Sequence, residues 1–123
     1  MIGSTRTVCV WAHPEPADLR AGFDGLAALV TSRLGRDPLS GHLFLFVNRN
    51  RTRAKVLVWD GTGLCIYAKR LEHGRFASLW KERAAAVELT TSELALFLEG
   101  SRAVGRMALS PAIFIPRPLA SRT

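Results

Sequence analysis

The sequence predicts a small α+β domain, in which an antiparallel β-meander of three to five strands packs against one or two helices. Three strand-like runs follow one another with only short polar or glycine-rich gaps between them, which is typical of such a meander. An apolar helical periodicity precedes these runs and a second helix signal follows them, so the order favours helices that cover one sheet. The length of 123 residues suits a single domain, which we assign to residues 1–100.

The first strand and the first helix are predicted from a proline break and from helical spacing. Val8–Ala12 is strand-like, and Pro14 and Pro16 end it because proline lacks a backbone donor. Asp18 is then expected as the N-cap or first-turn acid of a helix. The apolar face of this helix would comprise Leu19, Phe23, Leu26, Leu29, Val30 and Leu34, and Gly35 would close it.

Two glycines, Gly22 and Gly25, lie inside this helical pattern. Each costs about 1 kcal/mol relative to alanine in a helix interior. We therefore expect either a close approach to the backbone at these positions or an irregular first turn.

The remaining elements follow from turn residues and one capping signature. The meander strands are His42–Asn48, Ala54–Asp60 and Leu64–Leu71, and Val87–Leu89 is a further short strand. Thr90 and Glu93 fit a capping box, which predicts a second helix that ends at Gly100. Residues 101–123 contain three prolines and no clear periodicity, so we expect an irregular C-terminal tail.

Composition indicates an ordinary globular protein, with 48% hydrophobic and 22% charged residues. No signal peptide is visible and no run approaches the roughly 20 apolar residues that span a bilayer, so a cytoplasmic protein without a membrane partner is expected. Cys9 and Cys65 both lie in strand-like runs, and buried free thiols are expected there rather than a disulfide.

Charge is unevenly distributed along the chain, whose formal net charge is +7. Residues 49–83 carry nine basic and three acidic residues, whereas residues 1–48 carry four of each. Such a concentration favours a polyanionic partner, and nucleic acid is the commonest one. A basic but merely solvated surface is the alternative.

Most catalytic chemistries find little support in the pattern. The three histidines and two cysteines show no closely spaced pair of metal ligands, so neither a metal nor another cofactor is expected. Asp60-Gly61-Thr62-Gly63 resembles a hairpin turn more than a phosphate loop, because no helix is predicted after it. A nuclease would need clustered carboxylates, and we expect no catalytic residues, although a cryptic nuclease that uses Asp24 or Asp60 stays open.

The strongest physical signal is a basic hairpin between two predicted strands. A two-stranded ribbon fits the DNA major groove, and arginine also binds phosphates without reading sequence. A second basic cluster follows at the next turn. The candidate nucleic-acid-binding residues are Arg49, Arg51, Arg53, Lys55, Lys69, Arg70 and Arg75. The interleaved Trp59, Tyr67 and Phe76 would stack on unpaired bases or, as we favour, pack in the core.

Four ordered motifs of the chain resemble a known family, the TnpB accessory protein of the IS sixty-six group of insertion sequences. It is distinct from the much larger RNA-guided nucleases of the same label. The motifs are Asp18–Leu26, Asp37–Phe44, Asn48–Lys55 with Trp59–Gly63, and Lys69–Phe76, and the likeness resumes at Leu89–Gly100. The sequence departs from the family pattern at residues 77–87 and after Gly100.

The resemblance implies a non-catalytic role in transposition beside a separate transposase. The partners would be DNA at the transposon ends, the cognate transposase, or both. The first motif offers a separate interaction surface, made of Asp18, Arg20, Gly22, Phe23 and Asp24, in which Arg20 would pair with Asp24 four residues on. A module that bridges to the transposase without touching DNA is therefore the alternative to DNA binding, and the sequence leaves the oligomeric state open.

Overall fold

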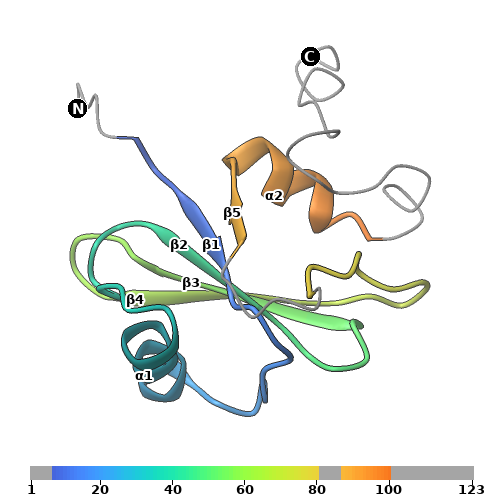
Figure 1. Cartoon of the computed structure of the whole chain (residues 1–123), viewed down its shortest axis with the longest axis horizontal. Helices are drawn as coiled ribbons and strands as arrows, with labels where there is room; N and C mark the ends of the chain where they lie inside the picture. The colour runs from blue at the N-terminus through green and yellow to red at the C-terminus, as the bar shows by residue number, and fades with distance from the viewer. Residues whose placement is uncertain (1–6, 81–86, 101–123) are drawn as a thin grey trace.

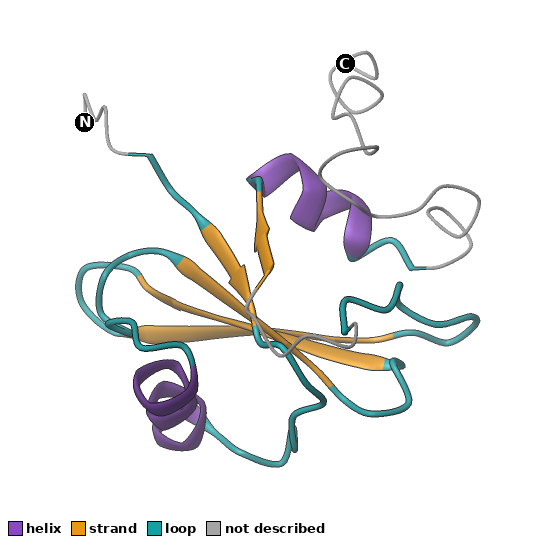
Figure 2. Cartoon of the chain, viewed as in Figure 1, coloured by secondary structure: helices purple, strands orange, loops and turns teal. Residues whose placement is uncertain are grey.

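The computed structural model describes residues 7–80 and 87–100, and it has the predicted α+β architecture (Figures 1 and 2). A five-stranded sheet has the strand order β4-β3-β2-β1-β5. One helix lies on each face of this sheet. The elements are β1 (Val10–Ala12), α1 (Phe23–Arg33), β2 (Leu43–Val47), β3 (Arg53–Trp59), β4 (Leu64–Arg70), β5 (Val87–Leu89) and α2 (Thr91–Phe97).

The strands from β2 to β4 form the predicted antiparallel meander, but β1 runs parallel to β2. The parallel pairing arises because α1 carries the chain back across the sheet between the two strands, as in a βαβ unit. The carboxyl ends of β1 and β2 therefore lie at the same end of the sheet (Figure 1). At this end, backbone hydrogen bonds from His13 to Leu45 (2.8 Å) and from Ala17 to Val47 (2.9 Å) hold the β1–α1 loop against β2.

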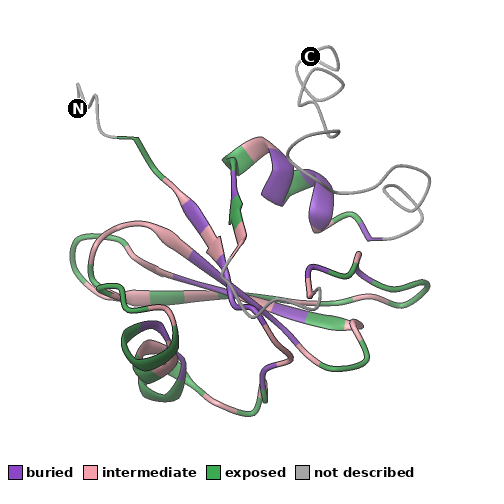
Figure 3. Ribbon diagram, viewed as in Figure 1, coloured by how far each residue is buried: buried purple, intermediate pink, exposed green. Residues whose placement is uncertain are grey.

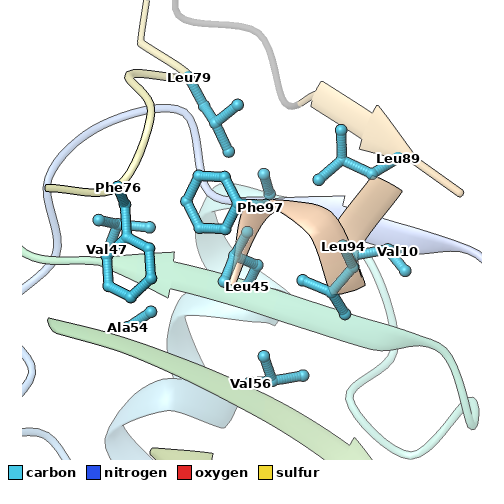
Figure 4. Close-up of a cluster of buried hydrophobic side chains, with 11 residues drawn as sticks. Val10, Leu45, Val47, Ala54, Val56, Phe76, Leu79, Leu89, Leu94 and Phe97 are labelled. Carbon is cyan, nitrogen blue, oxygen red and sulfur yellow. The ribbon is translucent and has the colours of Figure 1, made fainter. Parts of the chain in front are cut away.

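Each face of the sheet has its own hydrophobic core, because side chains alternate between the two faces along a strand. On the α2 side, Phe97 and Phe76 stack with their ring centroids 5.1 Å apart (Figure 4). On the α1 side, Leu26 and Val30 pack on Phe44 and its neighbours. Figure 3 shows that burial is concentrated in the central strands, whereas β4 alternates between half-buried and exposed residues.

The start of α1 differs from the sequence prediction. The helix begins at Phe23 rather than near Asp18, and Gly22 caps it without a side-chain hydrogen bond. Asp18 belongs to the preceding loop, where its carboxylate accepts hydrogen bonds from Arg20 instead. The predicted apolar face therefore begins in a loop. Leu19 packs against the core from there, so apolar spacing extended the predicted helix too far.

Gly25 and Gly35 are required for two different reasons. A Cβ atom at Gly25 would lie 2.9 Å from the Cβ of Ala21, so a close approach explains this glycine as expected. Gly35 adopts a φ of +63° just after the helix, a conformation that favours glycine. The backbone of Arg36 then donates to the carbonyl of Val30 (3.1 Å), which satisfies a carbonyl in the last turn.

The capping box of α2 is confirmed. The Thr90 hydroxyl accepts from the Glu93 backbone (3.0 Å), and the Glu93 carboxylate accepts from the Thr90 backbone (2.8 Å). We predict that Thr90→Ala lowers the free energy of unfolding by about 1 kcal/mol, because the variant leaves a backbone donor of α2 without its partner. Urea denaturation measures this loss. Thr90→Ser retains the hydroxyl and serves as the control, and equal losses in both variants would contradict the capping role.

The two cysteines are free thiols, as expected, but only Cys9 is partly buried. Cys65 is exposed, because it lies on the edge strand β4 rather than inside the sheet. Neither of the helices in the described part of the chain has the length and hydropathy of a membrane span. The predicted tail lies outside the described residues.

Candidate nucleic-acid interface

The predicted basic hairpin is the β2–β3 turn, and the side chain of Asn48 organises it. The side-chain oxygen of Asn48, Oδ1, accepts from the backbone of Thr52 (2.9 Å) and of Arg53 (3.0 Å). The Asn48 side-chain amide donates to the Thr52 hydroxyl (3.3 Å). Arg51 adopts a positive φ of 60°, which is uncommon for a residue with a Cβ atom. The turn is thus fixed by hydrogen bonds rather than by glycine.

Arg51 itself is directed inward rather than toward a ligand. Its guanidinium donates to the carbonyl of Phe76 (3.0 Å), and the Phe76 backbone donates back to the Arg51 carbonyl (2.7 Å). Arg51 therefore ties the basic turn to the loop that follows β4. The Arg51 side chain is half-buried, and part of its guanidinium is engaged by the Phe76 carbonyl.

Arg49 and Arg53 are the exposed cations of the turn. Neither guanidinium has a hydrogen-bond or ion-pair partner among the residues that the structure describes. An arginine held on a rigid turn without an internal partner retains all five N–H donors for an external anion. Of the predicted cations, these two residues are the best placed to bind an external anion.

The register of β3 and β4 divides the remaining cations between the two faces of the sheet. Arg53 lies opposite Arg70 on the α1 face, and Lys55 is on that face two residues further along β3. Lys69 lies opposite Ala54 and is therefore on the α2 face. Its ammonium donates to the carbonyl of Leu98 at the C-terminal end of α2 (2.7 Å), where a cation is favourable.

A groove on the α1 face brings the basic strands next to the first sequence motif. The Lys55 ammonium donates to the carbonyl of Ala21 (3.2 Å), so it bridges β3 and the β1–α1 loop. The groove has a volume of about 440 Å³. Its lining residues are Leu19, Arg53, Ala54, Lys55, Ala68, Lys69, Arg70 and Glu72. Leu19 and Ala68 were not predicted as site residues. The placement of Leu19 depends on the parallel pairing of β1, whereas Ala68 lies opposite Lys55 in the β3–β4 ladder.

The end of β4 carries the last two predicted cations. Arg70 forms an exposed ion pair with Glu72 (3.2 Å), which offsets part of its charge. Arg75 is exposed in the following loop and takes part in an interaction of its own. The predicted patch is therefore brought together at one end of the sheet, except that Lys69 lies on the opposite face.

The first motif forms an exposed polar loop that leads into α1. Arg20 binds both carboxylate oxygens of Asp18, with a shortest distance of 2.7 Å, rather than pairing with Asp24 as predicted. Hydrogen bonds from the Arg20 side chain and backbone lower the pKa of Asp18 to about 2. Phe23 is 50% exposed at the start of α1, which is unusual for a large apolar side chain.

The interleaved aromatics have different surroundings. Phe76 is fully buried, which confirms core packing for this ring. Trp59 is half-buried, and Tyr67 is 54% exposed on the α2 face of β4. Only Tyr67 therefore offers an accessible ring, and it lies on the face opposite the groove.

The segment from Asp60 to Gly63 is a hairpin turn and not a phosphate loop. One Asp60 oxygen accepts from the backbone of Thr62 (2.9 Å) and of Gly63 (2.9 Å), and Gly61 has a φ of +106°. These backbone donors, followed by the Cys65 thiol and the Thr62 hydroxyl, lower the pKa of Asp60 to about 2. Within residues 7–80 and 87–100, no three metal-ligating side chains lie close enough to hold a metal ion.

The Asp60 turn makes stability depend on pH in acid. Because the folded-state pKa of about 2 is below the unfolded value of about 3.9, the carboxylate stabilises the fold above pH 4. This contribution is lost as the pH falls from 4 toward 2. Urea denaturation across this window should show a shallower pH dependence for Asp60→Asn than for the unaltered protein. Asp24→Asn removes an exposed carboxylate and is the control, and identical profiles for the unaltered protein and Asp60→Asn would contradict the assignment.

Comparison with known proteins agrees with the motif resemblance. The sequence model of a family described as IS66 Orf2 like protein matches residues 8–106. The sequence therefore belongs to a class of proteins associated with insertion sequences. The chain is a member of the IS66 Orf2-like family. The matched range includes residues 77–87, where the sequence departs from the motif pattern.

Two relatives from Sinorhizobium fredii (strain NBRC 101917 / NGR234) extend this comparison. The chain is 37% identical over 101 residues to the uncharacterized protein y4hO, and this alignment covers 81% of the chain and 86% of y4hO. It is 34% identical over 100 residues to the uncharacterized protein y4jC, which covers 81% and 85%. No solved structure matches the chain significantly.

Proposed function

We propose that this protein is a non-catalytic accessory factor of insertion-sequence transposition, which binds DNA in the bacterial cytoplasm through the basic end of its sheet. The observation that carries the proposal is the β2–β3 turn. Arg49 and Arg53 are exposed there, without a partner among the described residues, on a backbone fixed by Asn48. Because the chain belongs to an insertion-sequence family, DNA is the polyanion that such a surface would bind.

The basic residues divide into two roles in this proposal. Arg49, Arg53, Arg70 and Arg75 are exposed and would contact phosphates. Arg51, Lys55 and Lys69 each donate to a backbone carbonyl and would position the surface. The interface is therefore smaller than the seven cations named from the sequence.

The test is fluorescence anisotropy with a labelled duplex of the transposon end across a salt series. Each phosphate contact contributes close to one unit to the log–log salt slope. The double variant, Arg49→Ala combined with Arg53→Ala, should weaken binding and lower the magnitude of the slope by about two units. Arg36→Ala is the matched control, because Arg36 is exposed but lies over the Trp11 ring, beyond the far end of α1.

Three outcomes are informative. Loss of affinity in the double variant alone supports the proposed surface. Equal effects of Arg36→Ala and of a single Arg49→Ala would mean that only net charge matters. Absence of DNA binding by the unaltered protein at low salt would overturn the proposal.

A second function, bridging to the transposase, is favoured by one specific observation. Phe23 is 50% exposed and follows the exposed Asp18–Arg20 pair by three residues, and an accessible aromatic near polar groups is typical of a protein contact. Phe23→Ala should then reduce co-purification with the transposase from nuclease-treated lysate, while DNA affinity is unchanged. Retention of the transposase by this variant would exclude Phe23 as the anchor.

A further inference from the structure

Two arginines of the groove face each other in the closest arrangement that a sheet allows. Backbone hydrogen bonds from Leu71 to Thr52 (2.8 Å) and from Asp60 to Gly63 (3.0 Å) fix which β3–β4 pairs are hydrogen-bonded. By alternation, Arg53 and Arg70 form a non-hydrogen-bonded pair, in which opposite side chains approach most closely. The two arginines therefore project from directly opposite positions on the same face of neighbouring strands, and both line the groove.

Such a pair opposes folding unless an anion is present, because like charges directly opposite on a sheet repel. Glu72 offsets only Arg70, through an exposed ion pair. Arg53 has no acidic partner among the described residues, and Lys55 adds a third cation on the same face. Three cations of the α1 face, together with Lys69 and one carboxylate, thus line a single groove, and core packing does not account for them.

The shape of the groove adds a size limit. Its volume of about 440 Å³ is within the range of pockets that enclose small molecules, about 300–1,000 Å³. Leu19 and Ala68 contribute apolar surface between the cations. One nucleotide fits a hollow of this size, whereas a double helix can present only its outer phosphates to the exposed arginines. Arg49, which does not line the groove, would remain available to a duplex backbone.

We propose that this groove binds the phosphate of an unpaired nucleotide, held between Arg53 and Arg70 with Lys55 behind it. The inference rests on the proposed DNA-binding function and specifies the form of DNA, a single-stranded stretch or tail beside the duplex. Planar guanidinium groups bind phosphate oxygens in a two-pronged geometry, so a pair of them forms a clamp. Apolar surface beside the clamp would contact the sugar or base.

The first experiment compares a blunt duplex with the same duplex carrying a short thymidine tail, by anisotropy at constant salt. Replacement of both groove arginines, Arg53→Gln with Arg70→Gln, should weaken binding of the tailed DNA about tenfold or more and reduce its preference over the blunt duplex. Arg49→Gln should weaken both DNAs by the same factor. Equal losses of the groove variant on both DNAs would overturn the groove assignment and leave the proposed function in place.

A second experiment separates the groove from DNA binding as a whole. Thymidine monophosphate should shift the side-chain Nε–H NMR signals of Arg53 and Arg70, and thymidine without phosphate should not. If the unaltered protein bound no DNA, the proposed function would fail, and these shifts alone would decide whether the groove takes a nucleotide. Absence of shifts would overturn the groove. Urea denaturation should show that Arg53→Gln does not destabilise the fold, because it removes a repulsion.

Discussion

Truncation of Phe97 to alanine is expected to lower the free energy of unfolding by about 3–5 kcal/mol, the cost of removing a large aromatic ring from a core. Phe97 is fully buried and stacks on Phe76, so its ring joins α2 to the loop after β4 (Figure 4). The same cluster includes Val10 of β1 and Leu45 of β2. Since small domains are stable by only about 5–15 kcal/mol, this variant should be close to unfolding at room temperature.

Urea denaturation followed by circular dichroism measures the effect. Phe97→Leu retains most of the buried volume and is the control, with a smaller expected loss. Phe76→Ala in the same background tests the coupling, because two stacked rings that lose a common contact should show a combined loss below the sum. A loss of less than 1 kcal/mol for Phe97→Ala would mean that α2 does not anchor this core.

Sequence signals that act within a few residues predicted the local structure well. Strand alternation and turn residues placed every end of β2, β3 and β4 within about one residue of its observed position. Thr90 and Glu93 gave the start of α2, because both hydrogen bonds of a capping box join residues three positions apart. Of the two explanations offered for Gly25, a close approach or an irregular first turn, the Cβ of Ala21 provides the first.

Sequence signals were insufficient where long-range pairing decides the outcome. The parallel direction of β1 follows from how α1 packs, and this pairing brings Leu19 beside the basic strands. Apolar spacing alone also extended α1 back to Asp18, although the helix begins at Phe23. An apolar residue in a loop buries the same surface as one in a helix, so periodicity does not distinguish them.

The sequence also did not show which cations form internal hydrogen bonds and which are exposed. A run of arginines and lysines shows charge, but the internal acceptors lie far along the chain. Arg51 donates to Phe76, Lys55 to Ala21 and Lys69 to Leu98, at sequence separations of 25, 34 and 29 residues. What clustering predicts is a basic surface, and only the fold identifies the exposed arginines within it.

Asn48→Ala is expected to damage both stability and DNA binding, because this one side chain fixes the turn that presents Arg49 and Arg53. Two backbone donors, of Thr52 and Arg53, lose their acceptor in the variant. With Thr52 half-buried, a loss of about 1–3 kcal/mol in the free energy of unfolding is expected. A turn released from this geometry also orders its arginines only on binding, which costs about 0.5–1.5 kcal/mol for each immobilised side chain.

Anisotropy and urea denaturation on the same samples separate these two effects. Asn48→Asp retains an acceptor oxygen for both backbone donors. It loses only the hydrogen bond from the side-chain amide to the Thr52 hydroxyl, so it should preserve the turn. Its added negative charge should weaken DNA binding at low salt and have little effect at high salt, because salt screens exposed charges. Asn48→Ala should weaken binding at every salt concentration, since its defect is one of geometry. Should the alanine variant bind as tightly as the unaltered protein, the arginines would act as a flexible cluster, and the rigid turn would serve folding alone.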